Sequence, residues 1–280
     1  FISIRCLAIP LSDKQEVPTL FAFLLTCLVR ELRAKKKLFE MNTGNFERMD
    51  MIDLEQYTLN HPYDNHYKNK NAWYVYGCRL LDGRGCPKDP EKALDHFEEI
   101  SCKDSRAALQ AGFCYYNGVG TSQDMEEALK YFRRVSDVLG IISREGYLWM
   151  GKCLLKIQKG QEAIACLKKV MENVKVLNKI VHAKPEIEKE AKCLLGMCHY
   201  YGIEVKENKE IALQYFKEAS LGERANLIAQ YYLSHCYQKG IGTKVNPKRA
   251  EHWRSICFEQ DYKGLVNEMK NMVGVTSEKA

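Results

Sequence analysis

The chain has 280 residues, a formal net charge of +6 and 46% hydrophobic residues, so it holds enough apolar material for a sizeable core. Its basic residues are interspersed with acidic ones and form no long stripe, which argues against a nucleic-acid partner. Length alone allows two globular domains, but internal repeats change that count because each repeat buries its apolar face only against its neighbours.

Residues 1–70 share none of the repeated pattern found further along the chain. An apolar run at residues 17–29 is too short to span a bilayer comfortably, and its basic cluster follows the run instead of preceding it, unlike a signal peptide. Three interpretations stay open: a packed or disordered extension, a translated leader that is not native coding sequence, and a membrane-contacting segment. Alternative start positions are Met41, Met49 and Met51.

An alanine and a glycine five positions apart recur along residues 71–256. The pairs are Ala72 and Gly77, Ala107 and Gly112, Ala191 and Gly196, and Ala229 with Ser234 in place of glycine. A second alanine follows each of these anchors by sixteen positions, at Ala93, Ala128, Ala212 and Ala250. Read at helical spacing, each unit is a helix, a glycine turn and a second helix, and about five units are expected.

Large residues accompany the small anchors. Phe97, Phe132 and Phe216 each lie four positions after the second alanine, where they are expected to fill the groove between neighbouring helix pairs, while the small anchors let the two helices of a pair approach closely. The third unit has a turn shortened by four residues, which is typical of a tetratricopeptide hairpin. The fourth unit has Glu204 where the second turn glycine is expected, so its turn is predicted to have a different shape.

Two segments carry a resemblance to a known repeat family. They are ALQAGFCYYNGVGTSQDMEEALKYF at 108–132 and YLSHCYQKGIGTKVNPKRAEHW at 232–253. Both resemble Sel-1-like repeats, relatives of the tetratricopeptide repeat with the pattern A-x-x-x-L-G-x-x-Y-x-x-G-x-G followed by D-x-x-x-A. The resemblance covers roughly two thirds of the chain and implies an all-α fold, a right-handed α-solenoid of antiparallel helix pairs. Residues 97–132 are further similar to a cytoplasmic adaptor that binds a lipoprotein-receptor tail.

Four cysteines occupy equivalent positions two residues after the anchors: Cys114, Cys153, Cys198 and Cys236. Equivalent positions in neighbouring units lie about 10 Å apart, whereas a disulfide needs Cα atoms within about 7 Å. We therefore expect small core residues instead of disulfides. The sequence contains no C-x-x-C, so no zinc site is expected. Free thiols indicate a reducing compartment, and we expect a cytoplasmic location.

The sequence lacks the common catalytic signatures, namely H-E-x-x-H, G-x-S-x-G, S-x-x-K and the phosphate-binding G-x-x-x-x-G-K-[ST]. We expect no enzyme activity, no cofactor and no metal. His199 and His235 are interpreted as packed or surface histidines. The adjacent carboxylates at 98–99 and at 126–127 point in different directions on a helix and are interpreted as solvated.

By resemblance to tetratricopeptide arrays, the first helices line a concave face, with inward positions three before and one, four or five after each anchor. Aromatic, amide and lysine side chains there suit an extended peptide. The predicted binding residues are Tyr74, Phe113, Tyr116, Asn117, Lys152, Lys156, Tyr200, His235, Gln238 and Lys239. The alternative is that the aromatic members pack between repeats. Asn117, Lys152 and Lys239 have no expected anchoring role, so exchanging the two lysines for glutamate should weaken peptide binding at unchanged thermal stability.

The predicted organisation is therefore an extension at 1–70, a repeat array at 71–256 and a capping helix with a tail at 257–280, the helix covering 261–272. The predicted function is a scaffold or adaptor for another protein, either an extended peptide or a receptor's cytoplasmic tail. The alternative is a regulatory or accessory subunit of an enzyme complex, with a hydrolase of the bacterial repeat type ranked below it. Membrane association is expected only through a partner or through the apolar N-terminal segment.

Overall fold

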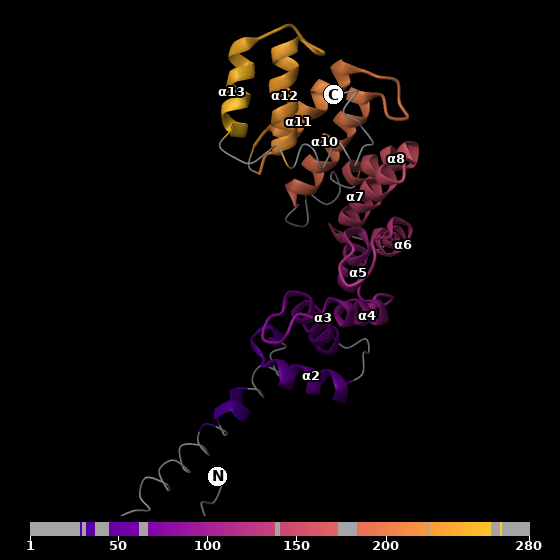
Figure 1. Cartoon of the computed structure of the whole chain (residues 1–280), viewed down its shortest axis with the longest axis vertical. Coiled ribbons are helices and arrows are strands. Elements are labelled where there is room, and N and C mark those ends of the chain that lie inside the picture. The colour runs from indigo at the N-terminus through magenta and orange to yellow at the C-terminus, as the bar shows by residue number, and fades with distance from the viewer. Residues whose placement is uncertain are drawn as a thin grey trace, which may run out of the picture. The chain divides into compact units, whose positions relative to one another are not determined.

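The computed structural model describes residues 29, 32–36, 45–61, 67–137, 141–172, 184–222, 224–258 and 264. Every regular element in these residues is helical, which confirms the all-α prediction (Figure 1). The helices are η1 (Phe46–Arg48), α2 (Met51–Asn60), α3 (Tyr67–Asp82), α4 (Pro90–Ile100), α5 (Ser105–Asn117), α6 (Met125–Ser136), α7 (Ile141–Lys156), α8 (Gly160–Glu172), α10 (Pro185–Tyr201), α11 (Lys209–Ser220), α12 (Leu227–Lys239) and α13 (Pro247–Phe258).

The chain divides into two compact units between Tyr76 and Gly77, within α3. Apart from Val29 and Gly264, the apolar run at 17–29 and the capping helix expected at 261–272 lie outside the described residues. None of the helices that the structure describes has the length and apolar character needed to cross a membrane.

In the first unit, α2 packs on the beginning of α3 through aromatic side chains. The Tyr57 hydroxyl donates to Asn69 Oδ1 at 3.0 Å, and the Tyr76 hydroxyl donates to Glu55 Oε1 at 2.7 Å. Leu54 of α2 is completely buried. The rings supply apolar contact area while their hydroxyls bond polar partners, so α2 is attached without leaving these hydroxyls unsatisfied.

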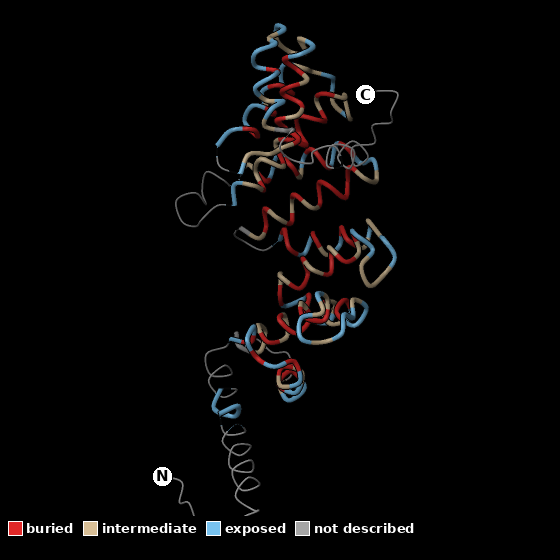
Figure 2. Tube along the Cα trace, turned by 60° about the vertical axis from the view of Figure 1, so that its left-hand side comes forward, coloured by how far each residue is buried: buried red, intermediate tan, exposed pale blue. Residues whose placement is uncertain are grey.

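The second unit is a series of helix pairs, α5–α6, α7–α8, α10–α11 and α12–α13, with α4 packed on α5. Buried residues gather where these helices face one another, and exposed residues lie on the outer turns (Figure 2). Three first helices end at a glycine in the left-handed region, Gly118, Gly202 and Gly240, with φ of 68°, 69° and 70°. Glycine adopts this conformation without a Cβ penalty, so the chain reverses directly after the helix.

The anchor glycines set the distance between the two helices of a pair. A Cβ on Gly112 would lie 2.5 Å from the Phe132 ring, and one on Gly196 would lie 2.7 Å from the Phe216 ring. In the last pair the serine anchor is accommodated because the Ser234 hydroxyl donates to the Ala250 carbonyl at 3.0 Å. The predicted close approach of the two helices at the small anchors is therefore confirmed. The Phe132 and Phe216 rings pack inside their own pairs and also stack on Trp149 and Tyr232 of the next pairs, which agrees with the predicted filling between neighbouring pairs.

The equivalent cysteines are core residues, as predicted. Cys153, Cys198 and Cys236 are completely buried, and Cys114 is nearly so. Burial raises the pKa of the Cys114 thiol to about 11 and the pKa values of the other three to about 12. At neutral pH these thiols are protonated, so they behave as small apolar side chains and not as nucleophiles.

The turn between α7 and α8, in the third repeat, is shortened as predicted. Three residues, 157–159, separate α7 from α8, whereas seven residues, 118–124, separate α5 from α6. The prediction for the turn between α10 and α11, in the fourth repeat, was wrong, because this turn has the same backbone shape as the turn between α5 and α6. Glu204 adopts a φ of 50°, and the Asn208 amide donates to the His199 carbonyl at 3.0 Å, as the Asp124 amide does to the Tyr115 carbonyl at 2.9 Å.

The contact with the preceding pair explains why a glutamate is tolerated there. In the second pair, a Cβ on Gly120 would lie 2.3 Å from the Pro90 carbonyl oxygen of α4. In the fourth pair, the residue at the start of the preceding second helix is Gly160, and a Cβ on it would lie 2.5 Å from Glu204 Cγ. In the second repeat the glycine of this contact lies in the turn, at Gly120. In the fourth repeat it lies at the start of the preceding helix, at Gly160, and this leaves room for the Glu204 side chain.

Candidate functional site

All ten predicted binding residues lie on the first helices of the pairs. Tyr74 belongs to the first unit, where it is half-buried on α3. The other nine lie in the second unit on α5, α7, α10 and α12, and we call these nine the first-helix surface. They are Phe113, Tyr116, Asn117, Lys152, Lys156, Tyr200, His235, Gln238 and Lys239.

On α5 and α7, aromatic rings from neighbouring pairs meet. The Trp149 ring receives Phe113 edge-on at 4.7 Å and Tyr116 edge-on at 5.1 Å between centroids. Lys156 Nζ lies 4.0 Å from the centroid of the Tyr116 ring, within range of a cation–π interaction. Trp149 was not among the predicted residues; its position two before an anchor glycine is the sequence signal that marks it. We call Phe113, Tyr116, Trp149 and Lys156 the α5–α7 cluster.

Lys152 has an anchoring role, contrary to the prediction. Its side chain is buried, and Nζ lies 2.5 Å from Glu190 Oε1 on α10 and 3.8 Å above the Trp149 ring. A buried ammonium requires such a partner because desolvation of the charge is costly. Exchange of Lys152 for glutamate would place two carboxylates together, so that substitution cannot leave stability unchanged.

On α10 and α12, hydroxyl and imidazole groups take the place of the indole. The Tyr200 hydroxyl lies 3.1 Å from His235 Nδ1, and the Tyr201 and Tyr232 hydroxyls lie 2.9 Å apart. Lys209 from α11 sits 4.0 Å over the Tyr200 ring and also donates to the Tyr200 carbonyl. Burial raises the pKa of the Tyr200 phenol well above its ordinary value, so it stays neutral. These five residues form the α10–α12 cluster.

The first-helix surface thus has a buried and an accessible part. Tyr116, Lys152 and Tyr200 are buried and join neighbouring pairs, as in the alternative interpretation of the aromatic positions. The accessible part consists of exposed Asn117, Gln238 and Lys239 together with half-buried Phe113, Lys156 and His235. The residues that remain open to a partner are therefore amides, two lysines, an imidazole and one aromatic ring.

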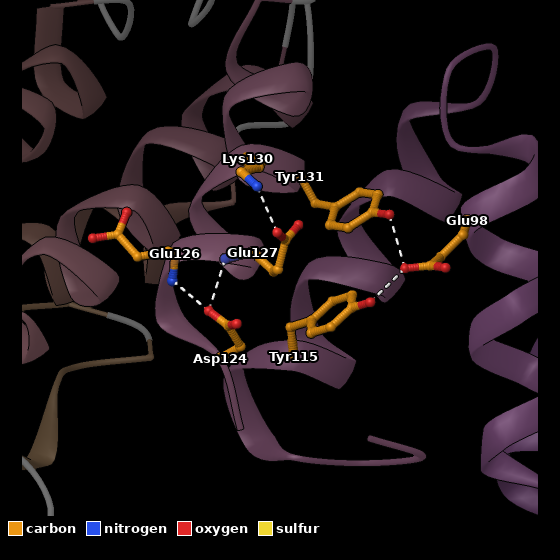
Figure 3. A network of polar contacts seen from close by, with 7 residues as sticks. All are labelled: Glu98, Tyr115, Asp124, Glu126, Glu127, Lys130 and Tyr131. Atoms are coloured by element: carbon orange, nitrogen blue, oxygen red, sulfur yellow. Dashed lines mark hydrogen bonds and ion pairs between the residues drawn. The ribbon is translucent and has the colours of Figure 1, made fainter. Parts of the chain in front are cut away.

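A second polar arrangement lies between α4, α5 and α6. Glu98 Oε1 accepts hydrogen bonds from the Tyr115 hydroxyl at 2.7 Å and the Tyr131 hydroxyl at 2.8 Å, and both rings point toward it (Figure 3). Glu98 is therefore a joining residue and not a solvated one, whereas Glu99 and Glu126 are exposed as expected. The bond to Glu98 raises the pKa of the Tyr115 phenol to about 12. Both phenols remain neutral, so this junction attaches helices.

The equivalent junction between α8, α10 and α11 has the opposite charge. The His199 ring stacks on the Tyr215 ring at 5.9 Å, where the other junction stacks Tyr115 on Tyr131 at 5.7 Å. Burial and the Lys168 ammonium lower the pKa of the His199 imidazole. A neutral histidine packed on a ring agrees with its interpretation as a packed residue. Among the described residues, no three His, Cys, Asp or Glu side chains are grouped so that they hold a metal ion.

Four segments of the chain match the family model of the Sel1 repeat, at residues 72–104, 105–137, 189–222 and 227–253. They coincide with the α3–α4, α5–α6, α10–α11 and α12–α13 pairs. The α7–α8 pair, which has the shortened turn, lies outside these matches.

Two solved structures are similar to the chain. A Sel1 repeat protein from Oxalobacter formigenes is 19% identical, with a TM-score of 0.56 over 88% of this chain and 95% of that protein. The protein c5321, a protective antigen present in uropathogenic Escherichia coli strains and displaying an SLR fold, is 17% identical with a TM-score of 0.58. That match covers 89% of this chain, which spans only 56% of c5321. At these identities the similarity establishes the fold.

Proposed function

We propose that this chain, which carries Sel1 repeats, is a non-enzymatic scaffold or adaptor that binds an extended peptide of another protein on a concave face formed by its first helices. Sel1 repeat proteins generally mediate protein–protein interactions, and their fold is typically a non-catalytic interaction scaffold. The observation that carries the proposal is that the accessible part of the first-helix surface combines amides, lysines, an imidazole and an aromatic ring.

These side chains supply what an extended peptide needs. Asn117 Nδ2 donates to the Phe113 carbonyl at 3.0 Å, which orients its Oδ1 to accept from a peptide N–H, and the Gln238 amide can pair with peptide backbone groups. The half-buried ring of Phe113 provides apolar contact area. The buried members contribute indirectly. Tyr116 and Tyr200 hold Lys156 and His235 in place, so the surface is ordered before a partner arrives and less side-chain entropy is lost on binding.

The proposed partner is the cytoplasmic tail of a receptor, and the proposed location is the cytoplasm. The first rests on the similarity of residues 97–132 to the cytoplasmic protein that binds the tail of megalin, a lipoprotein-receptor relative. The second rests on buried cysteine thiols at equivalent positions of successive pairs, which suit a reducing compartment. In this proposal membrane association follows from the receptor.

Affinity capture with two matched triple variants tests the proposal. The surface variant combines Asn117→Ala, His235→Ala and Gln238→Ala. The control combines Gln161→Ala, Gln214→Ala and His252→Ala, which likewise removes two amides and one imidazole, from exposed positions on the second helices α8, α11 and α13. We expect the surface variant to lose at least about tenfold of a captured partner that the control retains. Equal capture by both variants, with both folded by urea titration, would refute the concave-face proposal.

A further inference from the structure

Lysine is the only charged residue type on the later part of the first helices α5, α7, α10 and α12. From the anchor to the helix end, residues 112–117, 151–156, 196–201 and 234–239 contain three lysines and no aspartate or glutamate. Lys152 is the buried one and is neutralised by Glu190. Lys156 and Lys239 are the two accessible ones, and each lies five residues after its anchor.

Neither of these two lysines forms an ion pair with a carboxylate within the described part of the chain. Lys156 rests on the Tyr116 ring, which attracts the ammonium without cancelling its charge, and Lys239 is exposed at the end of α12. Glu207, a carboxylate in the turn after α10, lies 3.3 Å from Lys209 and is thereby engaged. Two positive charges therefore lie at repeat-equivalent positions of the first-helix surface.

The repeat geometry sets the distance between them. Lys156 belongs to the α7–α8 pair and Lys239 to the α12–α13 pair, with the α10–α11 pair in between. Packed helices lie about 10 Å apart, so positions two pairs apart are separated by about 20 Å. An extended peptide advances about 3.3 Å per residue, and six residues cover this distance. The intermediate position, five after Gly196, is Tyr201, whose ring is half-buried.

We propose that the first-helix surface selects an extended acidic peptide with two carboxylates about six residues apart, one for Lys156 and one for Lys239, and an apolar or aromatic residue midway over Tyr201. This inference rests on the proposed function and adds the charge and spacing of the partner. Two isolated cations fit a peptide better than a nucleic-acid strand, which presents one phosphate about every 3.4 Å and needs a continuous basic track.

A phage-displayed library of random 12-residue peptides, selected on the full chain, tests the spacing. The expected result is enrichment of peptides with an acidic pair separated by five to seven positions. Synthetic peptides with the pair at three, six and nine positions, titrated by fluorescence anisotropy, should bind best at six. Lys156→Glu and Lys239→Glu should each weaken binding of the six-spaced peptide by about tenfold, and raised salt should weaken it further.

The matched controls are Lys168→Glu and Lys248→Glu, which make the same charge change at exposed positions on the second helices of the same two pairs. They should leave binding within about twofold. Enriched peptides without an acidic pair, whose binding is lost in Tyr201→Ala or His235→Ala but not in the lysine variants, would overturn this inference and leave the proposed function intact. Absence of any enriched peptide would overturn both. Equal displacement of bound peptide by poly-U or by phosphatidylserine vesicles at matched charge would show a general anion surface and also overturn the spacing rule.

Discussion

The α5–α6 and α10–α11 pairs use one steric plan with different electrostatics. Gly112 meets Phe132 in the first pair as Gly196 meets Phe216 in the second, at nearly the same separation. Both first helices end at a left-handed glycine, and both turns make the same backbone bonds. What repeats in this chain is therefore the contact that sets how closely two helices approach.

Each of these two pairs meets the preceding second helix, α4 or α8, at a polar junction, and the two junctions carry opposite charges. Tyr115 and Tyr131 share the Glu98 carboxylate, whereas the equivalent residues His199 and Tyr215 lie near the Lys168 ammonium. The glycine where a turn meets the preceding second helix also differs in position. It is Gly120, in the turn, for α5–α6, and Gly160, at the start of α8, for α10–α11. Polar groups at these junctions vary because any locally satisfied set permits the same stacking of pairs, and this freedom allows a surface to be specialised without altering the fold.

The largest expected effect comes from removing the shared steric contact. Phe132→Ala and Phe216→Ala each delete a completely buried ring and should cost about 3 to 5 kcal/mol of unfolding free energy. Urea titration followed by circular dichroism measures this, with both midpoints expected to fall by similar amounts. A cost below about 1 kcal/mol in either pair would contradict the idea that one steric plan carries both.

Next in size is the ion pair that joins α7 to α10. Glu190→Gln leaves a buried ammonium without its partner and should cost about 3 kcal/mol, while Lys152→Met leaves Glu190, which is partly exposed, and should cost about 2 kcal/mol. On the α5 side of α7, Lys156→Met should cost less than about 1 kcal/mol because that ammonium is already accessible to water. Thermal unfolding of the three variants would contradict this order if Lys156→Met were the most damaging.

Substitutions where a turn meets the preceding helix give a third, smaller effect, and Gly160 with Glu204 forms a double-mutant cycle. Gly120→Ala introduces a Cβ against the Pro90 carbonyl at a φ of 74° and should cost about 2 to 3 kcal/mol. Gly160→Ala should cost only about 1 kcal/mol because the facing Glu204 side chain can move, and Glu204→Gly should recover that cost. Additive effects of the two substitutions would show that Gly160 and Glu204 do not compensate each other.

Sequence alone predicted the features that arise from sequence-local patterns. Anchor spacing predicted the close approach of α5 and α6 at Gly112, and the shortened interval after Gly151 predicted the tight turn between α7 and α8, because each reflects positions within one repeat. Lys152 was misjudged, since its partner Glu190 lies in the next repeat. Glu204 was misjudged for the same reason, because a glutamate fits at this turn position only when Gly160 faces it from the preceding repeat. Contacts between repeats join positions that the pattern of a single repeat does not relate.

The carboxylate junction should respond to loss of its phenols. Tyr115→Phe and Tyr131→Phe each remove one hydrogen bond to Glu98 and should cost about 1 kcal/mol, because the site is partly exposed and water replaces some of the bond. Since both hydroxyls bond the same oxygen, the bond that remains in each single variant offsets part of the loss, and the double variant should cost more than the sum of the two. Spectrophotometric titration supplies an independent readout: the pKa of Tyr115 is about 12 in the intact junction and should fall toward 10 in Glu98→Gln.

The smallest expected effect is a pH dependence that arises at His199 in the α10–α11 pair. Burial and Lys168 hold the pKa of His199 below its ordinary value of 6.5, so between these two pKa values the unfolded chain binds more protons than the folded one. The stability from neutral His199 is then fully present above about pH 6.5 and is lost as the pH falls toward the folded pKa. His199→Phe keeps a ring on Tyr215 and should flatten the stability profile between pH 7 and 5, whereas Tyr115, the equivalent residue of the other pair, does not titrate in this range.

An NMR titration should place the His199 midpoint below 6.5 and move it upward in Lys168→Gln. A midpoint at or above 6.5 would mean that the two junctions do not differ in charge in the way that their side chains indicate.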